Sequence, residues 1–170
     1  MKLALIGGGN MGGALLKALV KSNTLAASDT LLIEPDSGKR ENLVRETGCR
    51  AKASIDDEIA GADCLLLAVK PQSATDVMPT LKPLLTGNPM LISVMAGVSM
   101  QSLEEGLGLK KLVRVMPNTP ALVGEGMSVY FASEAVNDEE REWIRKLFSS
   151  CGSCMEEEDE KQWTTKNIRK

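Results

Sequence analysis

Residues 3–19, "LALIGGGNMGGALLKAL", contain the pattern that decides the fold. The stretch begins with an apolar run, passes through five glycines between residues 7 and 13, and resumes with apolar residues at helical spacing. A short apolar run bounded by glycine is typical of a buried strand, and apolar residues three or four apart are typical of a helix. Glycine weakens both structures, so the turn between strand and helix must require it.

Gly7, Gly9 and Gly12 form a GxGxxG motif between the predicted strand and the predicted helix. In this context the first glycine permits a tight turn, the second lets a pyrophosphate approach the backbone, and the third lets the helix pack on the strand. The free N–H groups at the start of the helix then attract the phosphates. The motif therefore predicts dinucleotide binding, with candidate contacts at Gly7, Gly8, Gly9, Asn10, Met11 and Gly12.

Short apolar runs alternate with helix-like stretches along the rest of the chain, which favours an α/β fold. We predict a Rossmann-like, doubly wound, mostly parallel sheet with helices on both faces. The predicted strands are "KLALI", "TLLIE", "DCLLLAV", "MLISVM", "KLVRVM" and "MSVYFA", with a short last strand near residues 151–155. The predicted helices span residues 11–22, 38–47, 55–60, 71–85, 99–107 and 138–149.

Composition limits the function. The chain has 170 residues, 43% of them hydrophobic, which suffices for one well-buried core. We assign residues 1–155 to one nucleotide-binding domain and residues 156–170 to a charged tail. The net charge of -3, with both signs interspersed, argues against a nucleic-acid or membrane-surface partner and favours a small-molecule substrate. The first residues lack the features of a signal peptide, so we expect a cytoplasmic protein.

The chain contains no histidine and four cysteines. The commonest acid–base residue is therefore absent, no catalytic acid can be named, and no metal is expected. The pair Cys151-Gly-Ser-Cys154 has the spacing of a redox motif, but a lone CxxC is a weak signal. Because a catalytic pair is expected at a helix N-terminus, we interpret these cysteines as small residues beside a strand.

The choice of dinucleotide stays open. Glu34 follows the glycines by about twenty residues, where an acidic group accepts a hydrogen bond from a ribose hydroxyl and repels a 2'-phosphate. This position favours NAD. Ser37, Lys39 and Arg40 come next in the sequence and could hold the phosphate of NADP. Both cofactors are candidates.

Two later strand ends are candidate contacts for the nicotinamide half, because ligands bind beyond the carboxyl ends of parallel strands. The run "LLLAVKPQ" ends its predicted strand at Val69, and "ISVMAGVS" places small groups after the next one. Lys70 is a candidate acid, a neighbour of a phosphate or carboxyl group, or a solvent-facing lysine. The candidate residues here are Ala68, Val69, Lys70, Pro71, Met95, Ala96 and Gly97.

The segments "GGGNMGGAL", "LLLAVKPQ", "SVMAGVS" and "VRVMPNTPALVGEG" taken together resemble pyrroline-5-carboxylate reductase, over residues 1–162. The resemblance implies transfer of a hydride from NADH or NADPH to 1-pyrroline-5-carboxylate, giving proline. It places residues 7–12 at the pyrophosphate, residues 68–71 and 95–97 along the nicotinamide, and Pro117 and Asn118 nearby. Ile55, with Ser54 beside it, stands where the family often has an asparagine that touches the adenosine.

The resemblance also implies a second, helical domain that builds a homo-oligomer and holds the substrate. That domain has no counterpart within residues 1–170, so we expect nucleotide binding with little turnover, and a monomer or a non-native association. The resemblance breaks off at "WTTKNIRK"; a shifted reading frame, a truncated gene model, a cut and a naturally divergent end are the open explanations. A β-hydroxyacid-dehydrogenase-like reductase and a non-catalytic nucleotide-binding module are the alternative functions.

Overall fold

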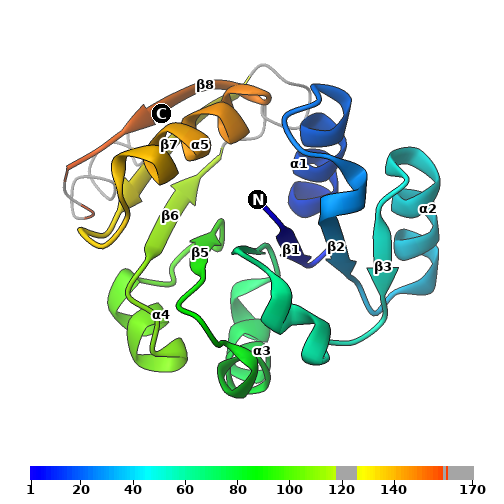
Figure 1. Cartoon of the computed structure of the whole chain (residues 1–170), viewed down its shortest axis with the longest axis horizontal. Helices are drawn as coiled ribbons and strands as arrows, with labels where there is room; N and C mark the ends of the chain where they lie inside the picture. Colours follow the sequence, from blue (N-terminus) through cyan, green and yellow to red (C-terminus); the bar gives the residue numbers. More distant parts are fainter. Residues whose placement is uncertain (118–125, 159, 161–170) are drawn as a thin grey trace.

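The computed structural model describes residues 1–117, 126–158 and 160, and these form a single sheet with helices on both faces (Figure 1). The strand order is β3-β2-β1-β4-β5-β6-β7-β8. The strands from β3 to β6 are parallel, β7 runs antiparallel to β6, and β8 is parallel to β7. This confirms the predicted fold class. The strands are β1 (Leu3–Ile6), β2 (Thr30–Ile33), β3 (Arg50–Lys52), β4 (Cys64–Leu67), β5 (Met90–Ser93), β6 (Leu112–Met116), β7 (Gly126–Ala132) and β8 (Gly152–Glu156).

Five α-helices and four short 3-10 helices connect the described strands. The α-helices are α1 (Asn10–Lys21), α2 (Ser37–Thr47), α3 (Ala74–Leu81), α4 (Met100–Leu107) and α5 (Asp138–Ser149). The 3-10 helices are η1 (Ala27–Asp29), η2 (Asp57–Gly61), η3 (Pro71–Ser73) and η4 (Lys82–Leu84). Helix α5 has the predicted bounds, because the Asn137 side chain accepts from the N–H of Glu140 while the Glu140 carboxylate accepts from the N–H of Asn137.

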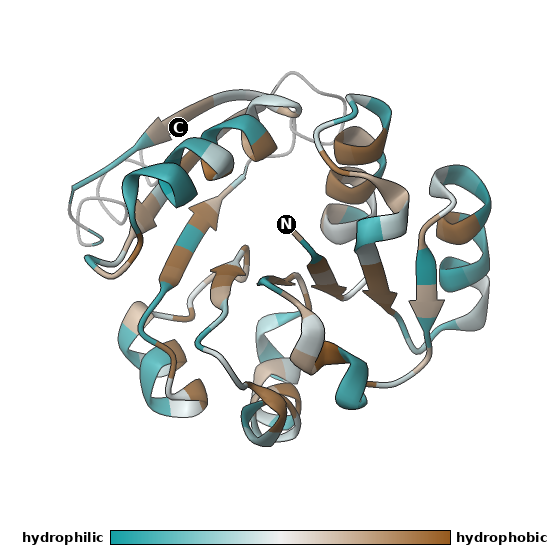
Figure 2. Cartoon of the chain, in the orientation of Figure 1, coloured by the Kyte–Doolittle hydropathy of each residue, from teal (hydrophilic) through white to brown (hydrophobic). Residues whose placement is uncertain are grey.

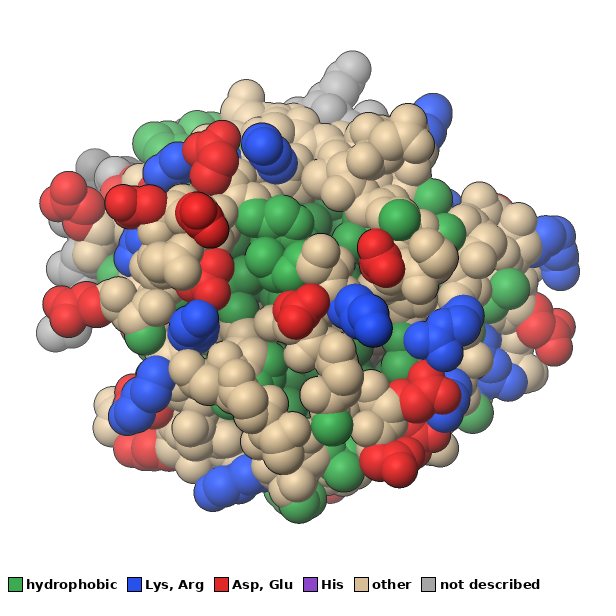
Figure 3. All heavy atoms as spheres, in the orientation of Figure 1, with side chains coloured by type: hydrophobic (Ala, Val, Ile, Leu, Met, Phe, Trp, Pro, Cys, Tyr) green, Lys and Arg blue, Asp and Glu red, His purple; other side chains and the backbone are tan. Residues whose placement is uncertain are grey.

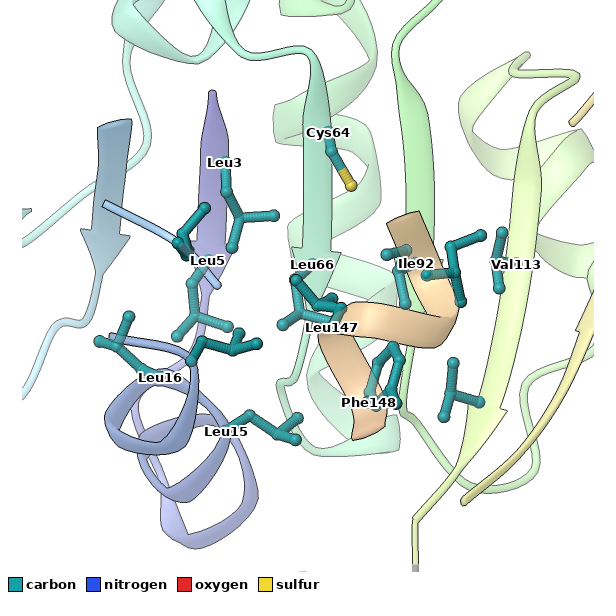
Figure 4. Close-up of a cluster of buried hydrophobic side chains, with 14 of the residues drawn as sticks. Leu3, Leu5, Leu15, Leu16, Cys64, Leu66, Ile92, Val113, Leu147 and Phe148 are labelled. Atoms are coloured by element: carbon teal, nitrogen blue, oxygen red, sulfur yellow. The ribbon is translucent and has the colours of Figure 1, made fainter. Parts of the chain in front are cut away.

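The helices form two layers. Helices α1, α2 and α5 cover one face of the sheet, and α3, α4 and η2 cover the other (Figure 1). Successive strand residues point to opposite faces, so Leu66 belongs to the core under α1 and α5 (Figure 4), whereas Leu65 belongs to the core over α3 and α4. Both leucines have 0% exposure. Figure 2 shows the central strands β1 and β2 in the hydrophobic colours and the helices striped, as two-sided burial requires.

Proline explains why the predicted helix over residues 71–85 is broken. Its residues form η3, α3 and η4 instead of one helix. Pro71 starts η3, Pro79 lies inside α3, and η4 contains the third proline, at position 83. A proline inside a helix removes one N–H donor and crowds the preceding turn, so one continuous helix is disfavoured.

Three further predictions differ from the structure. The predicted helix over residues 55–60 is the 3-10 helix η2. Strand β4 ends at Leu67 rather than at Val69, and β2 ends at Ile33, which places Glu34 just beyond the strand. Strand β3 was not predicted at all. It has three residues, two of them charged, and it pairs only with β2, so backbone hydrogen bonds form it without an apolar run.

The surface carries charges of both signs. On the face seen in Figure 3, basic and acidic side chains are intermingled rather than gathered in one patch.

Beyond β8, the Glu160 carboxylate accepts the N–H of Met100 at the start of α4, at 3.0 Å, and pairs with Arg114 of β6. Among the helices described here, none has the length and apolar character needed to cross a membrane.

Candidate functional site

The order of the strands places a crevice at the carboxyl ends of β1 and β4. The chain adds β2 and β3 on one side of β1 and then continues with β4 on the other side. Such a switch point is where open parallel sheets bind ligands. Hydrogen bonds join the strand ends there: the N–H of Ala68, after β4, donates to Ile6 O of β1 at 2.8 Å, and the N–H of Gly7, after β1, donates to Ile33 O of β2 at 2.9 Å.

The three glycines of the motif meet three different spatial requirements. Gly7 has a φ of +106°, and a Cβ there would lie 2.7 Å from the carbonyl oxygen of Ala68. A Cβ on Gly12 would lie 2.1 Å from the carbonyl oxygen of Gly7. A Cβ on Gly9 would meet no atom within 4 Å. Gly7 and Gly12 therefore let the loop and the helix pack closely, and Gly9 leaves open space beside the backbone.

The N-terminus of α1 is available to an anion. Gly9 is its N-cap, no side chain caps it, and its first turn contains no acidic residue. Within the described part of the chain, the N–H groups of Asn10, Met11 and Gly12 have no hydrogen-bond acceptor. Free N–H groups and the helix dipole together favour a phosphate at this point. The geometry therefore fits the diphosphate of a dinucleotide.

Two pockets flank the glycine loop. The first, of about 430 Å³, is lined by Ile6, Gly7, Gly9, Ile33, Glu34, Pro35, Lys39, Ala53, Ser54, Ile55, Ala68, Val69, Lys70, Ser73 and Val77. We call it the crevice pocket. The second, of about 410 Å³, is lined by Gly8, Gly9, Asn10, Gly13, Ala14, Lys17, Lys39, Asn42, Leu43 and Glu46. Gly9 and Lys39 belong to both, so the two pockets adjoin at the loop.

The acidic candidate lies in the wall of the crevice pocket. Glu34 is 8% exposed, and its carboxylate accepts the N–H of Gly8 at 2.7 Å and that of Asp36 at 3.2 Å. Arg40 donates from Nη1 to the carbonyl oxygens of Glu34, at 2.8 Å, and Pro35, at 3.3 Å. Lys39 lines the pocket and is exposed. Ser37, the first residue of α2, is exposed and does not line the pocket.

The nicotinamide candidates divide into two groups. Ala68, Val69 and Lys70 line the crevice pocket. Pro71, Met95, Ala96, Gly97 and Pro117 do not line it. Met95 is 2% exposed and belongs to the core over α3 and α4, so its side chain packs in the interior rather than beside the pocket. Asn118 lies outside the described residues.

Sequence reasoning missed part of the pocket wall. Pro35, Ala53, Ser73 and Val77 line the crevice pocket without having been candidates. Ala53 follows β3, so recognising that strand would have placed its end in the same crevice. Ile55, which stands where the family often has an asparagine that touches the adenosine, and the neighbouring Ser54 also line the pocket.

The cysteines lie away from this site. Cys154 belongs to β8 and Cys151 precedes it, so neither begins a helix. Burial raises the pKa of the Cys151 thiol, and burial raises that of the Cys154 thiol to about 11. Both are therefore mainly protonated at neutral pH, unlike the thiolates of redox pairs. Within the described ranges, no group of three or more histidine, cysteine or acidic residues could hold a metal ion.

Comparison with known families agrees with this geometry. The family described as "NADP oxidoreductase coenzyme F420-dependent" matches residues 2–97, which include the glycine loop, the Glu34 region and the loop after β4. The chain belongs to this family. The resemblance to pyrroline-5-carboxylate reductases is confirmed by relatives of that name. The enzyme of Pisum sativum is 34% identical over 157 residues, covering 92% of this chain and 57% of the relative.

Solved structures give the same result. A pyrroline-5-carboxylate reductase from Coxiella burnetii aligns with a TM-score of 0.89 at 27% identity, covering 95% of this chain and 60% of that one. The Plasmodium falciparum pyrroline carboxylate reductase, solved with NADP bound, aligns with a TM-score of 0.83 at 32% identity. This alignment covers 99% of this chain and 62% of that one. The chain therefore spans about three fifths of the length of these relatives.

Proposed function

We propose that this chain is the nucleotide-binding part of a reductase that converts 1-pyrroline-5-carboxylate to proline with NADH or NADPH. The observation that carries the proposal is the uncapped N-terminus of α1, with free N–H groups beside the open space at Gly9. A dinucleotide needs such a surface for its diphosphate. The names of the similar proteins support the substrate, and the family description supports the reaction class.

A bound nicotinamide would supply the hydride for the reduction. The residues of this chain would hold that cofactor. The loop of residues 7–12 would bind the diphosphate, and the wall formed by Glu34, Lys39 and Ser54 would hold the adenosine half. Ala68, Val69 and Lys70 would lie along the path to the nicotinamide, with Met95 to Gly97 and Pro117 beyond. The substrate-holding groups would come largely from the part of the relatives that this chain does not match.

We further propose that residues 1–155 act as one nucleotide-binding domain, and that residues 1–170 by themselves form a monomer or a non-native association. The resemblance supports this, because the helical domain that it implies for the homo-oligomer of the reductase family has no counterpart within residues 1–170. A cytoplasmic location is supported by the free thiols of Cys49, Cys64, Cys151 and Cys154, because thiols are kept reduced in that compartment.

Replacing Gly9 with alanine tests the diphosphate site. The new methyl group meets no protein atom within 4 Å, so the fold has room for it, but it projects where the diphosphate would lie. We expect NADH and NADPH to bind at least about tenfold more weakly, or about 1.4 kcal/mol. Fluorescence titration of each nucleotide measures the dissociation constants.

Gly61→Ala is the matched control, because a Cβ at Gly61 also meets no atom within 4 Å and the residue lies in η2, outside the crevice pocket. It is expected to leave both nucleotide affinities and the melting temperature unchanged. Equal affinities in Gly9→Ala and Gly61→Ala would contradict the assignment of Gly9 to the diphosphate.

The substrate is tested by measuring proline formed from 1-pyrroline-5-carboxylate and NADH or NADPH. The measurement is made with residues 1–170 alone and after adding the C-terminal part of a similar reductase. We expect little turnover by residues 1–170 alone, because substrate positioning contributes much of catalysis. Turnover after the addition would support the proposed reaction. Nucleotide binding without turnover under either condition would favour a non-catalytic binding module.

A further inference from the structure

The Glu34 carboxylate occupies the position after β2 that decides between the two dinucleotides. In folds of this kind that position faces the ribose 2'-hydroxyl, which is free in NAD and phosphorylated in NADP. Glu34 lines the crevice pocket with Gly7 and Gly9. Its contacts with Gly8 and Asp36 join the loop after β1 to the turn after β2. The side chain is therefore held at the point where the two loops meet.

The backbone donors around this position are already used by carboxylates. The N–H groups of Gly8 and Asp36 donate to Glu34, and the N–H of Lys39 donates to Asp36 Oδ1 at 2.9 Å. A 2'-phosphate needs several strong donors. Here it would have to displace a protein carboxylate from each of these three N–H groups.

The nearby cations do not compensate for an added phosphate. Arg40 turns Nη1 toward the carbonyl oxygens of Glu34 and Pro35. Lys39 faces the pocket, but it shares this turn with the carboxylates of Glu34 and Asp36. A phosphate monoester adds nearly two negative charges at neutral pH. Because like charges repel more strongly in a partly buried site, the phosphate would be disfavoured.

A ribose hydroxyl, in contrast, fits these groups. An ionised carboxylate offers about four lone-pair positions, and two of those of Glu34 are occupied by backbone N–H groups. The remaining positions can accept hydrogen bonds from the hydroxyls of an adenosine ribose. We infer that Glu34 makes the crevice pocket selective for dinucleotides with a free 2'-hydroxyl, and thus for NADH over NADPH. This inference rests on the proposed nucleotide-binding function.

The dissociation constants of NADH and NADPH, measured by calorimetry or nicotinamide fluorescence, test the inference without an activity assay. The unaltered chain is expected to bind NADH at least about tenfold more tightly than NADPH. Glu34→Gln removes the charge, keeps the shape and keeps an oxygen for the N–H of Gly8. It is expected to reduce the NADH preference at least about tenfold, mainly by strengthening NADPH binding.

Glu41→Gln is the control, because Glu41 is an exposed carboxylate on α2, the helix that follows Glu34, and does not line either pocket. The ratio of the NADPH and NADH dissociation constants of Glu41→Gln is expected to equal that of the unaltered chain. If Glu34→Gln does not fold, the selectivity at the 2' position is tested in the unaltered chain, by letting AMP and adenosine 2',5'-bisphosphate compete with bound NADH. AMP is expected to compete at least about tenfold better, because the two compounds differ only at the 2' position.

The possible results distinguish the proposed nucleotide-binding function from the proposed role of Glu34 in selectivity. Absence of binding by both nucleotides would overturn the proposed function itself. Binding of both with equal affinity, or tighter binding of NADPH, would leave that function standing and overturn the role of Glu34. A preference for NADH that Glu34→Gln does not alter would also overturn it.

Discussion

The substitution Gly12→Ala is expected to destabilise the protein by about 3 kcal/mol, because overpacking against a backbone atom leaves little room for relaxation. The added Cβ would lie 2.1 Å from the carbonyl oxygen of Gly7 and 3.2 Å from the Cβ of Ala68. To relieve this contact, α1 must move away from the ends of β1 and β4. The same movement would shift the N–H groups of the first turn away from the diphosphate.

Two measurements check this expectation. Urea denaturation gives the change in the free energy of unfolding, and nucleotide titration of the fraction that remains folded gives the change in affinity. Gly13→Ala is a matched control, since the neighbouring residue lies in the same helix and its Cβ would be 3.4 Å from Leu43 Cδ2, an ordinary contact. Alanine in a helix is favoured over glycine by about 0.5–1 kcal/mol, so this control is expected to be at least as stable as the unaltered chain. Equal stability of the two variants would contradict the close approach of α1 to β1.

The sequence permitted prediction of the elements that have strong local signals. The glycines at positions 7, 9 and 12 indicated both the turn and the helix after it, because Gly7 and Gly12 leave no room for a side chain and Gly9 keeps the backbone open to a ligand. The short, almost wholly apolar runs predicted β1, β2, β4, β5 and β6, since a strand covered on both faces is mostly apolar on both sides. The helix over residues 138–149 was predicted with the bounds of α5, and the structure adds the capping box that Asn137 and Glu140 form at its start.

The features that escaped prediction depend on residues far apart in the chain. Strand β3 exists because its backbone pairs with β2, and its own side chains carry no signal. Glu34 was foreseen as a ribose contact, but its hydrogen bond to Gly8 joins residues 26 positions apart. Ala53 lines the crevice pocket because it follows β3, so the failure to predict β3 also left Ala53 out of the candidate residues. Local sequence patterns do not encode such contacts between loops.

A second large effect is expected in the centre of the sheet. Leu66 has 0% exposure in β4 and belongs to the same core cluster as Leu15 of α1 and Leu147 of α5 (Figure 4). Leu66→Ala removes packed methyl groups and leaves a cavity, which is expected to cost about 3 kcal/mol of stability. For a chain of this size, that loss corresponds to a melting temperature lower by roughly 6–12 °C. Thermal and urea denaturation measure both quantities.

Leu65→Ala makes the same experiment a test of the two-layer architecture. Leu65 also has 0% exposure, but its side chain belongs to the opposite core, with Leu81 of α3 and Leu103 of α4. If helices cover both faces, the two alanine variants lose similar amounts of stability. Met155→Ala, at a residue of β8 that is 43% exposed, is expected to change it by less than about 0.5 kcal/mol. A large loss in only one of the leucine variants would mean that the other face is poorly covered, and the crevice formed by loops from both layers would lose its structural basis.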